Sequence, residues 1–80
     1  MKIKARVAYR DDTHRRLVSF YELEMKTYRT FIDEGDEHMI DYMYDVVGTL
    51  IDAMHVTDCI TFERWEYLRK EAGALRGWTA

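Results

Sequence analysis

Histidine, cysteine and carboxylate side chains recur at helical spacings in the middle of this chain. His38, Asp41 and Asp45 follow one another at intervals of three and four residues, and His55 precedes Cys59 by four. Such side chains at such spacings are typical ligands of zinc and other transition metals. However, the 80 residues include only three histidines and one cysteine, with no CxxC pair, no HExxH motif and no calcium-binding loop. We therefore expect no metal site and no cofactor, and we expect these carboxylates on a solvated helix face.

Side chains suited to catalysis are equally sparse. Cys59 is the one thiol, and His55 is the nearest base that could activate it, but this segment is expected to be a surface connection. A helix-capping turn explains the three carboxylates of Glu34, Asp36 and Glu37 better than catalysis does. In such a turn the helix dipole stabilises their negative charges. The sequence contains neither GxxxxGK(S/T) nor GxGxxG, the patterns of phosphate-binding loops. We therefore predict that the chain is not an enzyme.

Aromatic residues make up 14% of the chain and include six tyrosines and two tryptophans. Both types are enriched at the energetic centres of protein interfaces, although a small core also needs large side chains to bury enough area. Most of them are expected in the core. The exceptions fall at the edges of apolar helix faces or in the C-terminal tail. We predict the following contact residues: Tyr42, Tyr44, Tyr67 and Trp78.

Charge divides the chain into a basic start and an acidic body. Residues 1–16 hold six basic and two acidic side chains, whereas residues 17–80 hold six basic and 13 acidic ones, for a net charge of −3. A basic segment attracts polyanions or acidic protein surfaces, and an acidic face attracts a basic partner or imitates nucleic acid. The candidate partner-binding residues are Lys2, Lys4 and Arg6 at the basic start, and Glu34, Asp36, Glu37, Asp41 and Asp45 on the acidic face.

The elements that must position these side chains follow from the hydrophobic periodicity. Residues 2–10 alternate with period two, which predicts a half-buried strand, and the next three residues predict a turn or a helix cap. Residues 15–34 gather most of their apolar side chains on one arc of a helix. Gly35 is suited to end that helix in the left-handed conformation. The alternative is a β-hairpin formed by residues 2–10 and 15–24.

Two further helices are expected, over residues 37–55 and 61–72. Asp36 and Thr61 are suitable N-caps, and Gly73 is suited to end the last helix. The apolar arc of the helix over 37–55 spans roughly 200°, wider than the ~100° stripe of an ordinary surface helix. We therefore expect this helix to be packed from two sides, or to present one flank to a partner.

These elements predict a single, helix-rich α+β domain over residues 1–80, with one N-terminal strand followed by three helices in a small bundle. The hairpin alternative keeps two or three of the helices. If residues 15–34 are helical, the strand over 2–10 has no obvious partner within the chain and exposes unpaired backbone groups. It must then pair with a second copy, with the sheet of another protein, or with the tail at 75–79.

The opening sequence KIKARV, residues 2–7, resembles the start of ribbon-helix-helix repressors. In that family two strands form an antiparallel ribbon whose polar face enters the major groove of DNA. The resemblance implies that Lys2, Lys4 and Arg6 point at bases or phosphates, while the apolar residues between them face the core. The expected helices depart from the family, because the first is longer, the second begins with acidic residues and the third is extra.

Taken together, these features predict a small non-enzymatic protein that binds and modulates a macromolecular partner, by inhibiting or adapting it, as regulators encoded by phages and mobile elements do. A protein is the expected partner, bound through the strand edge, the acidic turn and the flanking tyrosines. One alternative is a ribbon-helix-helix-like dimeric repressor that binds DNA through the basic strand. Another is a small structural or assembly protein that acts by self-association, as a homodimer.

The sequence also predicts where the protein works. No apolar run approaches the ~18 residues that a membrane span needs, so no membrane partner is expected. The first residues lack the apolar region of a signal peptide. One cysteine cannot form an internal disulfide, which fits a reducing compartment. We therefore expect a cytoplasmic protein.

Overall fold

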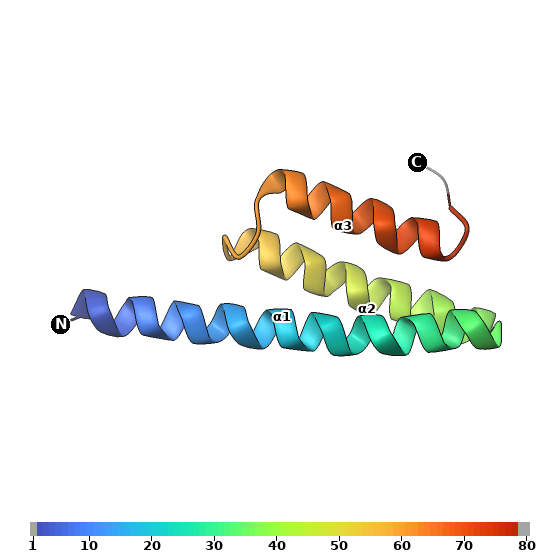
Figure 1. The fold of residues 1–80 in the computed structure, drawn as a ribbon, viewed down its shortest axis with the longest axis horizontal. Helices are drawn as coiled ribbons and strands as arrows, with labels where there is room; N and C mark the ends of the chain where they lie inside the picture. Colours follow the sequence, from blue (N-terminus) through green and yellow to red (C-terminus); the bar gives the residue numbers. More distant parts are fainter. Residues whose placement is uncertain (1, 79–80) are drawn as a thin grey trace.

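The computed structural model describes the backbone of residues 2–78 and the side chains of residues 12–78, and its chain forms three helices (Figure 1). Helix α1 spans Lys2–Glu34, α2 spans Glu37–Val56 and α3 spans Phe62–Leu75. Each helix runs back along the one before it, so that neighbours are antiparallel. No strand occurs between residues 2 and 78, so the predicted α+β class is wrong and the fold is an all-helical bundle.

The predicted strand over residues 2–10 is wrong, and so is the alternative hairpin with 15–24, because all of these residues belong to α1. Lysine, arginine and alanine are strong helix formers, and neither glycine nor proline interrupts α1. Lengthening a helix needs no new nucleus, whereas a lone strand leaves its backbone unpaired. The expected turn at Asp12 is also helical, since its carboxylate pairs one turn ahead with Arg16 at 3.1 Å and Arg15 at 3.5 Å.

The loss of the strand removes two of the predicted binding modes. A helical segment over residues 2–10 offers neither a two-stranded ribbon nor an edge strand, so the resemblance to ribbon-helix-helix proteins does not extend to the fold. Lys2, Lys4 and Arg6 lie on the first turns of α1, and their side chains fall outside the described part of the chain.

The turn between α1 and α2 confirms the prediction from sequence. Gly35 has φ +72°, and its amide donates to the Ile32 carbonyl at 3.1 Å, while the Asp36 amide donates to the Phe31 carbonyl at 3.2 Å. These bonds satisfy the last carbonyls of α1 in the pattern by which helices commonly end at glycine. The Asp36 carboxylate then accepts from the Met39 amide at 3.2 Å and caps α2.

Helix α3 begins as predicted and ends later. The Thr61 hydroxyl oxygen accepts from the Arg64 amide at 3.1 Å and caps the helix. The predicted end at Gly73 is wrong, because α3 continues past it and buries it. Gly77, with φ +90°, follows the end instead, and the Trp78 amide donates back to the Gly73 carbonyl at 2.9 Å.

The core lies where the three helices meet, with α2 at its centre. The buried Tyr28 hydroxyl donates to the Ala72 carbonyl at 2.6 Å and links α1 to α3. The Trp65 Nε1 donates to Asp52 Oδ1 at 2.7 Å and links α3 to α2. Because α2 packs against both neighbours, its wide apolar arc is explained in part. The buried core residues are Met25, Tyr28, Ile40, Met43, Val47, Ile51, Met54, Leu68 and Ala72.

The first third of α1 extends past the other two helices (Figure 1). His14 lies level with the end of α2, since its Nε2 hydrogen-bonds to the Thr57 carbonyl at 2.8 Å. Residues 2–13 therefore project by about 18 Å at the ~1.5 Å rise of an α-helix. The longest dimension of the molecule, 51 Å, is essentially the length of α1. None of the described helices combines the length and apolar character needed to cross a membrane.

Candidate functional site

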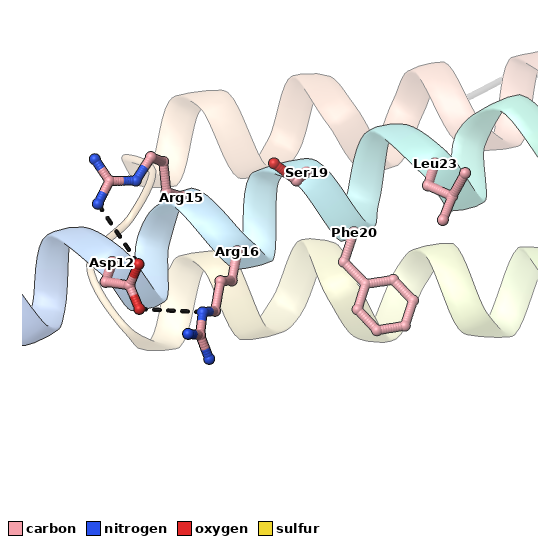
Figure 2. Close-up of a pocket in the computed structure, with 6 residues that line it drawn as sticks. All are labelled: Asp12, Arg15, Arg16, Ser19, Phe20 and Leu23. Carbon is pink, nitrogen blue, oxygen red and sulfur yellow. Dashed lines mark ion pairs between the residues drawn. The ribbon is translucent and has the colours of Figure 1, made fainter.

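An apolar surface crosses α1 and α2. Phe20 is 55% exposed, Leu23 60% and Tyr42 59%. Phe20 borders two shallow hollows, one on the outer face of α1 beside Leu23 (Figure 2) and one between α1 and α2. The second hollow also contains apolar side chains of α2. We call the following residues the apolar flank: Phe20, Leu23, Tyr42, Val46 and Leu50.

The apolar flank lies on the side of α2 away from α3. On the α3 side, the Arg69 guanidinium occupies the space that a Cβ at Gly48 would need. Positions two residues apart on an α-helix are about 200° apart. Val46 and Leu50, two residues before and after Gly48, therefore point away from α3. Among the described residues no third helix covers them.

Charged side chains border the apolar flank. On α1, Figure 2 shows Asp12 between Arg15 and Arg16, and all three line the same hollow as Phe20. On α2, Asp45 lines the hollow between the helices. An apolar centre with a polar rim is the usual anatomy of a protein–protein interface.

Burial disfavours the ionised forms of two potentially reactive side chains, the Cys59 thiol and the Tyr21 hydroxyl. Burial raises the pKa of the Cys59 thiol and so disfavours the thiolate, and its Sγ lies 4.0 Å from the His14 carbonyl oxygen. Burial, followed by the charge of Glu71, raises the pKa of the Tyr21 hydroxyl. Among the described residues, no three His, Cys, Asp or Glu side chains gather where they could hold a metal ion.

The predicted acidic residues are divided among different surroundings. Glu34, Asp36 and Glu37 are exposed at the α1–α2 turn, where Asp36 serves as the N-cap of α2. Asp41 forms an ion pair with Arg76 of the α3 end. Asp45 alone of the five lines the hollow beside Phe20.

The predicted contact aromatics are also separated. Tyr42 belongs to the apolar flank. Tyr44, about 200° around α2 from it, is half-buried and packs edge-on against Trp78, with ring centroids 4.9 Å apart. The Arg76 guanidinium lies 4.1 Å from the Trp78 ring centroid. Tyr67 is exposed on α3. The structure therefore places only Tyr42 beside the other exposed apolar side chains of α1 and α2.

Four of the five residues of the apolar flank were not among the predicted partner-binding residues: Phe20, Leu23, Val46 and Leu50. Periodicity assigns Phe20, Val46 and Leu50 to apolar helix arcs, but an arc does not show which of its edges is covered. Two signals were present in the sequence. Leu23 falls outside the apolar arc of its helix, and the arc of α2 is wider than one neighbour can cover.

No protein-family model matches this chain, and comparisons with curated proteins and with solved structures found no match either.

Proposed function

We propose that this chain is a small non-enzymatic protein that binds another protein through the apolar flank and modulates that partner by covering or bridging its surface. The observation that supports this proposal is the exposure of Phe20, Leu23 and Tyr42 in one continuous surface. Contiguous exposed apolar surface with a polar rim is typical of protein–protein sites.

Burial of the apolar flank supplies free energy on the scale that binding needs. Removing a Phe or Leu side chain from water contributes ~1.5–3 kcal/mol. Several such contributions together offset much of the ~4–15 kcal/mol that association costs in lost freedom. A small molecule would instead need an enclosed pocket, whereas both hollows around Phe20 are shallow and open.

The flank also differs from a nucleic-acid surface. DNA is gripped mainly through lysine and arginine contacts to phosphates. The centre of this surface carries Phe20, Leu23 and Tyr42 in place of such cations, and its α2 rim carries Asp45. A protein partner is therefore favoured over DNA for this face.

Affinity capture with the immobilised chain tests the proposal. Wild type, Phe20→Asp and Phe62→Asp are compared on one extract of the cells that produce the protein. Phe62 is a matched control because it is 58% exposed but lies on α3. We expect wild type and Phe62→Asp to capture the same protein in equal amounts. We expect Phe20→Asp to capture at least about tenfold less of that protein. Equal recovery by all three chains would contradict the proposal.

A further inference from the structure

The chain exposes more surface than a compact chain of its mass. A folded monomer of 9.6 kDa exposes about 5,100 Å² on average, whereas this chain exposes 6064 Å². The difference, roughly 1,000 Å², is close to the ~800 Å² that each partner buries in a standard protein–protein interface. An elongated body exposes more surface than a compact one, and this chain measures 51 × 22 × 13 Å.

On the face of α1 around Phe20, a positive and a negative side chain lie at equal distances before and after Phe20 along the helix. Arg16 lies four residues before Phe20 and Glu24 four residues after it, so all three share one side of the helix. Thr13 and Thr27, each seven residues from Phe20, continue the symmetrical pattern with small side chains. If two such helices run antiparallel with their Phe20 rings in contact, each Arg16 meets Glu24 of the other copy. The face is therefore self-complementary, as a two-fold interface requires.

The charges of this face remain open to a partner. Glu24 has no ion-pair partner among the described side chains. The Arg16 side chain is 82% exposed, and within residues 12–78 its one ion pair is with Asp12 on the same helix. Both can therefore form an ion pair across an interface without breaking a contact between helices.

The same register also covers the projecting part of α1. With Phe20 against Phe20, the first turns of α1 of one copy come level with the last turn of α1 of the other, near the turn to α2. Residues 2–10 contain four basic residues and no acidic one, and residues 34–37 contain three acidic residues. An antiparallel pair therefore places the basic segment 2–10 of each copy at the end where the other copy has its acidic turn, which favours this orientation over the parallel one.

We propose that the protein bound by the apolar flank is a second copy of this chain, in a two-fold antiparallel dimer with α1 against α1 and Phe20 at the axis. This inference rests on the proposed function, because it uses the same surface. Helices α1 and α2 of the two copies then form a four-helix arrangement. Tyr42, Val46 and Leu50 pack against α1 of the second copy, and α3 stays on the outside.

Sedimentation equilibrium of the full chain measures the association directly. We expect wild type to have twice the mass of one chain at about 100 μM, where an interface of standard size is occupied. Phe20→Asp should weaken the dimer by about 100-fold or more, because a charge is buried at the axis. Phe62→Asp should leave the dimer unchanged. Wild type that sediments as a single chain at this concentration overturns the dimer.

Charge reversal tests the antiparallel register. Arg16→Glu and Glu24→Arg should each weaken the dimer by about tenfold, because like charges then face each other across the axis. The doubly reversed chain should regain wild-type affinity to within about threefold, because each pair is again of opposite sign. Arg16 and Glu24 are two helical turns apart within one chain, so restoration can only come from contacts between copies. A double variant as weak as either single variant overturns the register.

The dimer and the proposed function can fail separately. If wild type is monomeric while capture of another protein depends on Phe20, the dimer is wrong and the protein-binding function stands. If Phe20→Asp changes neither the mass nor the captured protein, both are wrong. A dimer that is lost with Phe20→Asp and kept with Phe62→Asp supports the dimer and the role of the apolar flank as a protein-binding surface.

Discussion

Tyr28 shows how one side chain joins two helices. It is fully buried, and its hydroxyl donates to the Ala72 carbonyl in the last turn of α3. The last carbonyls of a helix have no partner within the helix itself. The hydroxyl therefore satisfies a carbonyl that would otherwise be buried and unpaired, and it holds α3 in place over α1.

Removing this hydroxyl tests its contribution. Tyr28→Phe keeps the ring but leaves the Ala72 carbonyl without this donor, so we expect the free energy of unfolding to fall by about 1–2 kcal/mol. Urea denaturation followed by circular dichroism measures the change. Tyr67→Phe is the control, because the Tyr67 side chain is exposed. We expect this variant to unfold at the same urea concentration as wild type. Equal stability of wild type and Tyr28→Phe would show that the hydrogen bond contributes nothing.

Tyr28, which is buried, and Tyr21, which is partly buried, also predict a dependence of stability on pH. Burial raises the pKa of Tyr28 above its ordinary value of 10.0, and burial followed by Glu71 raises that of Tyr21. The folded chain therefore holds these protons more tightly than the unfolded chain. The resulting stability is fully present below pH 10 and is lost as the pH rises through the raised pKa values.

Urea denaturation on both sides of pH 10 measures this loss. We expect the free energy of unfolding to fall less steeply with pH in Tyr28→Phe than in wild type, because one of the two groups is gone. A fall of equal steepness in both chains would contradict the assignment to Tyr28.

At the scale of the elements, helix ends separate α1 from α2. Residues 2–34 contain nothing that breaks a helix, and α1 runs through all of them. Gly35 and Asp36 then end one helix and begin the next within two residues. Local chemistry at the ends therefore sets where the chain reverses, and the reversal sets which faces of α1 and α2 meet.

Substitution at Gly35 tests this role. A Cβ at Gly35 meets no atom within 4 Å, so the cost of a side chain comes only from the backbone at φ +72°. We expect Gly35→Ala to lower the free energy of unfolding by about 1–2 kcal/mol and Gly35→Asn by less, because asparagine tolerates this conformation better. Thermal unfolding compares the three chains, and equal losses for alanine and asparagine would contradict the conformational explanation.

At the scale of the whole molecule, three helices enclose one small core and leave one flank of α2 open. α1 and α3 pack on two sides of α2, and Val46 and Leu50 lie away from α3, partly exposed at the edge of the contact with α1. The long α1 provides an edge against which a second copy can lie. A dimer would give the open flank a neighbour and would lengthen the apolar core across the axis.

Self-association makes thermal stability depend on concentration. Because the dimer forms only from folded chains, the Tm of wild type should rise as the protein concentration rises. Phe20→Asp, which removes the contact at the axis, should have a Tm that does not change with concentration. Differential scanning calorimetry over a wide range of concentrations checks both expectations, and a constant Tm for wild type would contradict the dimer.

Several parts of the fold and the site follow from the sequence alone. The helices over 37–55 and 61–72 were predicted close to the observed α2 and α3, and the roles of Gly35, Asp36 and Thr61 were correct. Caps and hydrophobic periodicity act over a few residues, so a single sequence is enough to detect them. At the candidate site, the sequence predicts Tyr42 from the flank of the apolar arc of α2 and Asp45 from the acidic face, and both line the hollow beside Phe20.

The structure decided the rest. Residues 2–10 fit a strand by pattern, but they continue α1, because propagating a helix costs less than leaving a strand unpaired. Tertiary packing decided which face of α2 is covered. An apolar arc as wide as that of α2 can be covered on any two of its sides. The packing of α1 and α3 determined which side stays open, and so brought Phe20 beside Val46 and Leu50 at the surface.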